Sequence, residues 1–247
     1  MSRALVKLTW VEVKLFTREP TTVAFSLAFP LLLLFVLAGV FGNDPDPDVY
    51  RGVGALDFYV PAYIALALAA VGFIGIPTHL AAYREAGVLR RLRASAVPIL
   101  SLFGSQLAVA LVLSGVSSLM IVSMVVVGYD VHAPASYGLV LLAYLLSAVS
   151  LAALGLFLGS LFKSPRTAQL VGMILFFVMM LLSGPGPPKE VLPTGMQRVA
   201  EALPLTHIVT LMQDPWLGLG WNYAEMGIVL LMTLGALSLA FRLFRWE

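Results

Sequence analysis

The sequence contains no cysteine and few charged residues. Without cysteine, the chain can form no disulfide framework, no thiolate metal site and no cysteine nucleophile, and its redox compartment stays open. Charged residues make up 11% of the 247 residues, whereas hydrophobic residues make up 60%. The mean hydropathy is +0.95. This composition lies outside the range of soluble domains, so we expect one all-α integral membrane domain over residues 1–247.

Several patterns that carry chemistry are also missing. Lys163 and Ser164 follow Phe162 without the glycine spacing of a phosphate-binding loop, so the chain is not expected to bind ATP itself. The three histidines stand far apart and form no metal-ligand pattern, and the Gly-x-Ser-Gly motif of six-helix intramembrane proteases is absent. No run of like charge is long enough for nucleic-acid binding. We expect neither an enzyme nor a metal site.

Long apolar runs are what the sequence does contain. A helix needs about 20 apolar residues to cross a bilayer, and six windows of roughly that length lack Asp, Glu, Lys and Arg. These windows are residues 22–41, 58–80, 99–127, 137–162, 167–183 and 227–241. The first window is as long as a full span, which predicts a retained helix rather than a cleaved signal peptide.

The basic residues predict the orientation, because Lys and Arg near span ends are kept on the cytoplasmic side. With both termini in the cytoplasm, only Arg51, Lys189 and Arg198 of the 15 basic residues fall outside. The remaining twelve fall inside: Arg3, Lys7, Lys14, Arg18, Arg84, Arg90, Arg91, Arg93, Lys163, Arg166, Arg242 and Arg245. The predicted outer segments carry most of the carboxylates.

The first 20 residues are amphipathic rather than apolar throughout. At about 100° per residue, Arg3, Lys7, Lys14 and Arg18 fall within about 60° of one another, with Trp10 beside them. This stripe predicts a helix in the headgroup region of an anionic membrane leaflet. A solvated leader is the alternative.

Proline and glycine dominate the long connection at residues 184–226. Residues 184–188 stop the fifth helix, and Pro193, Pro204 and Pro215 interrupt the apolar stretch that follows. We expect short or re-entrant helices packed against the outer mouth of the bundle, with a plain surface loop as the alternative.

The polar residues of the windows are neutral, which counts against an ion-coupled carrier. His79 and Glu225 stand at window ends, where we expect interfacial positions. The pairs Gly72/Gly75 and Gly155/Gly159 would permit close helix contacts.

The connection at residues 81–98 is both charged and amphipathic. Val88, Leu89 and Leu92 recur at three- and four-residue spacing, while the arginines around them point elsewhere. This pattern predicts a short helix that contacts a partner and lipid at once, and a simple positive-inside anchor is the alternative.

The run Arg-Glu-x-Gly-x-Leu-x-Arg-Leu-Arg-Ala at residues 84–94 resembles the loop after the second span of ABC-2 type transporter permeases. The resemblance extends to the basic start, the six spans, the proline-rich outer segment and the run Leu-Pro-Leu-Thr at residues 203–206. Val88 stands where the family often has Thr, and Ser95-Ala96 stands where it often has Thr-Pro, although Pro98 is kept. These departures blur the subfamily.

The resemblance implies a permease of a bacterial ABC exporter of the drug or natural-product efflux type, in the plasma membrane. Two separate ATPase subunits would bind ATP and Mg, and a second permease copy or a paralogue would complete the complex. The cargo would be amphiphilic, because the walls are apolar and serine-rich. The coupling helix would use Arg84, Glu85, Gly87, Leu89, Arg90, Arg91 and Arg93. A stand-alone channel, an ion-coupled carrier and a membrane scaffold are the competing interpretations.

Overall fold

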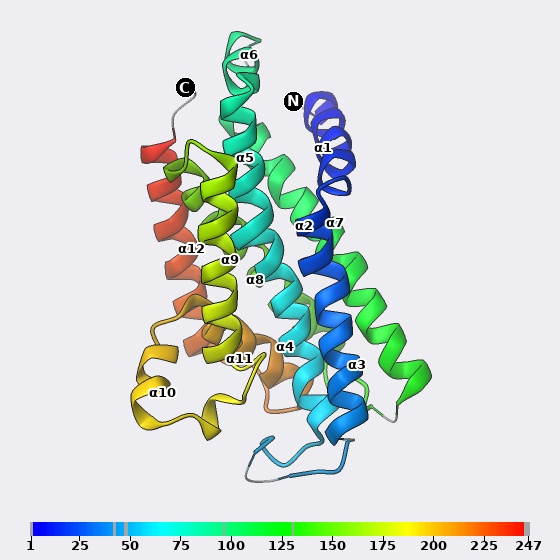
Figure 1. The fold of residues 1–247 in the computed structure, drawn as a ribbon. Helices are drawn as coiled ribbons and strands as arrows, with labels where there is room; N and C mark the ends of the chain where they lie inside the picture. Colours follow the sequence, from blue (N-terminus) through cyan, green and yellow to red (C-terminus); the bar gives the residue numbers. More distant parts are fainter. Residues whose placement is uncertain (1, 42, 47–48, 96, 130, 245–247) are drawn as a thin grey trace.

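The computed structural model describes residues 2–41, 43–46, 49–95, 97–129 and 131–244, with only the backbone given for residues 2–8 and 41. Within these residues the regular elements are helices, and one isolated β-bridge pairs Pro45 with Gly54. Figure 1 shows a bundle of long helices, with α1 and α6 at one end and α10 and α11 at the other.

The elements follow one another along the chain in a simple order. They are α1 (Ser2–Phe16), α2 (Pro20–Val23), η1 (Ala24–Ala28), α3 (Phe29–Phe41), α4 (Ala55–Ala70), η2 (Val71–Gly75), α5 (Ile76–Glu85), α6 (Val88–Ala94), α7 (Ile99–Gly128), α8 (Tyr137–Leu161), α9 (Pro165–Leu182), η3 (Lys189–Val191), α10 (Thr194–Ala200), α11 (Pro204–Trp216) and α12 (Tyr223–Leu243). Here η1 and η2 are π-helical turns, and η3 is a 3₁₀ turn.

In the described part of the chain, six helical stretches are long and apolar enough to cross a membrane. They are Pro20–Val40, Ala55–Glu85, Ile99–Gly128, Tyr137–Leu161, Pro165–Leu182 and Tyr223–Leu243. The predicted all-α membrane fold with six spans is therefore confirmed. The second span begins before and ends after the predicted window of residues 58–80, because it carries Asp57 and Arg84 inside its ends.

The second span forms the centre of the bundle. It consists of α4, η2 and α5 in succession, and its apolar window is wholly buried. Helices α3, α7, α8, α9 and α11 all contact it. Many of its residues are alanines, whose small side chains let neighbouring backbones approach closely.

Each π-turn lies just before a proline, which explains its position. Pro30 and Pro77 lack an N–H, so the carbonyl groups four residues earlier, on Ser26 and Phe73, lose their usual helical donors. The Ser117 hydroxyl of α7 donates to the freed carbonyl of Ser26. Such side-chain donors are one way in which a spanning helix tolerates proline.

Glycines let the outer spans reach the central one. A Cβ atom on Gly155 would lie 2.4 Å from the Gly72 carbonyl oxygen, and one on Gly172 would lie 2.1 Å from that of Phe73. Both distances are far below van der Waals contact, so α8 and α9 can pack here only through glycine. The close contact expected from Gly72 and Gly155 is present.

The proline-rich connection folds into η3, α10 and α11 rather than a plain surface loop. Helix α11 is almost wholly buried and packs against α4, α8 and α12. Its start at Pro204 uses the fixed backbone angle of proline at a helix N-terminus. This segment therefore completes the bundle at the end opposite α6 (Figure 1).

Candidate functional site

The chain turns sharply between α5 and α6. Gly87 has φ +67°, a left-handed conformation that glycine adopts without strain, and its N–H donates to the Arg84 carbonyl. The Gly87 carbonyl accepts the Arg91 N–H in the first turn of α6. This glycine sets α6 as a separate short helix beyond the end of the bundle (Figure 1).

Helix α6 has one buried side and one exposed side. Leu89 is fully buried in an apolar cluster that includes Phe16 of α1 and Leu102 of α7. The side chains of Glu85, Arg90, Arg91 and Arg93 are exposed. An apolar anchor thus holds the helix while its arginines point outward.

Arg84 occupies a different environment from the other arginines of the predicted coupling helix. Its side chain is buried, and its guanidinium donates to the carbonyl of Gly159, at 3.1 Å, and to that of Phe162. These carbonyls lie at the C-terminal end of α8, where a cation is favoured. Arg84 and Leu89 belong to the predicted coupling residues, and in the structure both side chains are buried by contacts within the chain.

Helix α1 packs along α7. Lys14 and Arg18 are exposed, and Trp10 is 72% exposed. The side chains of Arg3 and Lys7 lie outside the described residues. The opposite face of α1 contacts protein rather than lipid, because it buries Glu12 and Phe16 completely.

A buried glutamate–histidine pair joins α1 to the central span. The Glu12 carboxylate lies 2.6 Å from Nε2 of His79, and neither residue is more than 5% exposed. The rings of Phe16 and Tyr83 flank the imidazole, with centroids at 4.6 and 4.3 Å. The interfacial depth expected for His79 stays a prediction, and the structure adds that Glu12 is its partner inside the protein.

Sequence reasoning missed Glu12 although a signal was available. At about 100° per residue, Glu12 stands opposite the basic stripe and on the same face as Phe16. A carboxylate on the buried face of an amphipathic helix requires a partner. The sequence does not indicate which distant residue provides it.

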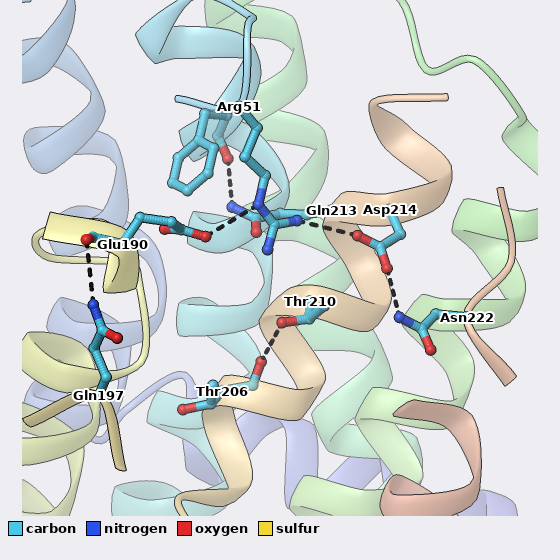
Figure 2. Close-up of polar contacts among 9 residues, drawn as sticks. Arg51, Glu190, Gln197, Thr206, Thr210, Gln213, Asp214 and Asn222 are labelled. Atoms are coloured by element: carbon cyan, nitrogen blue, oxygen red, sulfur yellow. Dashed lines mark hydrogen bonds and ion pairs between the residues drawn. The ribbon is translucent and has the colours of Figure 1, made fainter. Parts of the chain in front are cut away.

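The other end of the molecule holds a network of paired charges (Figure 2). Nε of Arg51 lies 3.2 Å from Oε1 of Glu190, and its terminal nitrogen lies 3.2 Å from Oδ1 of Asp214. Asn222 donates to the second oxygen of Asp214 at 2.9 Å, and Gln213 donates to the Phe58 carbonyl at 3.0 Å. Arg51 thus joins the connection after α3 to η3 and α11.

A second cluster surrounds Asp57, which is 4% exposed. Its carboxylate accepts hydrogen bonds from the backbone N–H of His132 at 2.8 Å and from the Asn43 amide at 3.2 Å. Nδ1 of the His132 ring lies 2.9 Å from the second carboxylate oxygen. Nearby, burial and the Asp46 carboxylate raise the pKa of Tyr50. Across the described residues, no three His, Cys, Asp or Glu side chains gather as metal ligands would.

Six spans, an amphipathic helix packed on the bundle and a basic helix between the second and third spans are the features of a multi-pass membrane protein. Residues 3–215 match the ABC-2 type transporter family, and the chain belongs to this family.

Two named relatives are similar to parts of the chain at 25–28% identity. The chain is 28% identical over 140 residues to the inner membrane transport permease YhhJ of Escherichia coli K12, covering 56% of this chain and 37% of the relative. It is 25% identical over 193 residues to the probable multidrug ABC transporter permease YbhR of the same strain, covering 76% and 52%. The matches therefore span about half or less of these relatives.

Proposed function

We propose that this chain is the transmembrane subunit of an ATP-driven exporter in the bacterial plasma membrane, with both termini in the cytoplasm. Its family is that of ABC-2 type transporters, and its sequence has no phosphate-binding loop of its own. The energy would therefore come from separate ATPase subunits that bind ATP and Mg. Two such subunits would pair with two permease copies, or with this chain and a paralogue.

The exposed face of α6 is the observation that carries this proposal. Its arginines lie on a short helix that projects from one end of the bundle, and the buried Leu89 anchors that helix in an apolar cluster that includes residues of α1 and α7. A rigid cationic ridge of this kind suits an acidic groove on a partner protein. A membrane anchor alone would not need a buried attachment point.

The contacts around α6 suggest how movement would reach the spans. A push on Glu85 and Arg90 would act through Leu89 on the apolar cluster around it and through Arg84 on the end of α8. Helix α6 follows α5 at the end of the central span and contacts it, so a movement of α6 would tilt that span. Transmission of this kind needs two discrete arrangements of the bundle, biased by nucleotide binding on the partner.

The cargo we propose is an amphiphile, such as a drug, a lipid-like molecule or a natural product. The spans offer apolar surfaces with scattered serines, and one relative is named as a probable multidrug permease. An ion would require charged groups along the spans. In the described residues, the charged side chains of the second span stand near its two ends.

The test is co-purification with a candidate P-loop ATPase, followed by ATP hydrolysis in lipid nanodiscs. Arg90→Ala/Arg91→Ala and Glu85→Ala should lower ATPase association or stimulated hydrolysis by about tenfold or more, as expected for lost interfacial charge pairs. Arg198→Ala, at an exposed arginine of α10, is the matched control. Equal behaviour of α6 variants and control would refute the coupling role.

A second outcome concerns the broader assignment. If no ATPase associates with the wild-type chain, the exporter proposal fails and the channel or scaffold interpretations take its place. The wild-type and variant arms therefore separate an error about the loop from an error about the function.

A further inference from the structure

An apolar groove of about 670 Å³ lies between α7 and α8, near the end of the bundle that holds α11. Val122 and Val126 of α7 form one wall, and Leu141 of α8 belongs to the other. Ile64 and Met212 lie at the groove from the central span and from α11. Its volume is within the range of sites that hold a small ligand. The groove lies along two spanning helices, where hydrocarbon rather than water surrounds the protein.

A second cavity of about 300 Å³ adjoins this groove and is more polar than the groove. Its lining includes Asp57 and Asn43 together with apolar residues such as Val53. His132, Ala133 and Trp216 line both cavities. The two spaces therefore meet at a shared wall, with a mixed polar and apolar cavity on one side and a largely apolar groove on the other.

The shared wall holds polar groups suited to the middle of an amphiphile. The His132 side chain is 88% exposed although its Nδ1 contacts Asp57. Trp216 is only 6% exposed, and its indole N–H has no hydrogen-bond partner in the described part of the chain. Buried donors are almost always paired, so this one is notable. A tryptophan at the boundary between apolar and polar surroundings is typical of lipid-headgroup depth.

Charge favours one kind of headgroup. Asp57 is the carboxylate of the polar cavity, and carboxylates outnumber basic side chains at this end of the described structure. The described carboxylates are Asp44, Asp46, Asp57, Glu190, Glu201, Asp214 and Glu225, against Arg51, Lys189 and Arg198. An ammonium group would be attracted to such a cavity, whereas a purely anionic headgroup would be repelled.

We propose that the two cavities together bind one phospholipid with an ammonium headgroup, of the phosphatidylethanolamine type. The ammonium group lies beside Asp57, the phosphate lies near the His132 ring, and an acyl chain fills the groove between α7 and α8. The ester region then lies by the Trp216 side chain, which lines both cavities. This site is separate from α6, and it does not rest on the proposed export function.

Native mass spectrometry of the delipidated full chain tests the proposal directly. The chain is incubated with phosphatidylethanolamine or phosphatidylglycerol carrying identical acyl chains. We expect one tightly retained phosphatidylethanolamine, with about tenfold weaker retention of phosphatidylglycerol, as one lost charge contact would give. Val122→Trp fills the groove and should abolish this preference. Leu231→Trp, at an exposed position of α12, should leave it unchanged.

A second measurement covers the case in which the Val122 variant does not fold. In a chain with Trp10, Trp221 and Trp246 changed to Phe, Trp216 becomes the only fluorophore. Phosphatidylethanolamine with brominated acyl chains should quench it more strongly than the phosphatidylglycerol equivalent. Equal quenching by both lipids, or equal retention of both by the wild-type chain, means that only bulk lipid contacts the groove and overturns the proposal.

Discussion

The two ends of this molecule treat their charges in opposite ways. At the end with α10 and α11, Arg51 bridges Glu190 and Asp214, Asp57 holds His132, and Glu225 lies 2.6 Å from His207. At the α6 end, no described carboxylate pairs with Arg90, Arg91 or Arg93. The first end pairs several of its charges within the chain, whereas the exposed arginines of α6 have no described carboxylate partner. This difference supports the proposed docking of a partner on α6.

The largest effect is expected in an experiment that asks which end of the molecule faces the cytoplasm. Because the chain has no cysteine, Arg93→Cys and Arg198→Cys each create a single labelling site. In intact cells, a membrane-impermeant maleimide should label Arg198→Cys and leave Arg93→Cys unlabelled until the membrane is permeabilised. The effect is all or none, since both side chains are exposed. The reverse pattern would place α6 outside the cell and remove its access to an ATPase.

The second prediction compares the buried Glu12–His79 pair with an exposed lysine on the same helix as Glu12. Glu12→Ala leaves His79 without its partner inside the bundle, which should cost about 3–5 kcal/mol. The apparent Tm in nanodiscs should fall by on the order of 10 °C. Lys14→Ala, on the exposed face of the same helix, should stay within about 0.5 kcal/mol of wild type. Similar melting of the two variants would show that the pair does not hold α1.

The third prediction concerns the packing of α9 on the central span, which connects the two ends. Gly172→Ala forces a Cβ atom toward the Phe73 carbonyl oxygen and should destabilise the bundle by about 1–3 kcal/mol, as overpacking does. Gly235→Ala is the control, because no atom lies within 4 Å of its added Cβ. The same thermal measurement checks both variants. If Gly172→Ala melts like Gly235→Ala, α9 does not pack tightly on the central span.

The smallest effect is expected at the paired end. Arg51→Ala removes two ion pairs whose side chains are 11–31% exposed, and it should cost about 1 kcal/mol. High salt should reduce the difference from wild type, because exposed ion pairs are screened. Melting curves at low and high salt measure both effects, with Arg198→Ala as the control. A salt-independent loss would point to packing of the Arg51 stem instead of charge.

The spans could be predicted because their signal is local. About 20 consecutive apolar residues can lie only in hydrocarbon or a large core, and the six windows of the sequence correspond to the six helices. The ends of the spans were predicted less accurately than the spans themselves. Asp57 and Arg84 belong to the second span because Asn43, His132 and the end of α8 satisfy them. Those partners lie far away along the chain.

The candidate site was predictable only in part, for the same reason. The pattern of Val88, Leu89 and Leu92 predicts a short amphipathic helix, and α6 is present in the structure. Periodicity did not separate the buried Arg84 from the exposed arginines, and it gave no partner for Glu12. Which residues meet depends on packing through Gly72, Gly155 and Gly172, and a single sequence does not report such contacts.

The length of the central span has a mechanical consequence. Its 31 residues extend for about 46 Å at 1.5 Å per residue, whereas the hydrocarbon layer is about 30 Å thick. If the helix tilts as one body about the glycine contacts near its middle, each arm is about 23 Å long. A rotation of about 5° would then displace each tip by about 2 Å, in opposite directions, by the same geometry. Because α6 follows one tip and the Asp57 cluster lies at the other, the coupling proposed for α6 would reach the opposite membrane surface through this one helix.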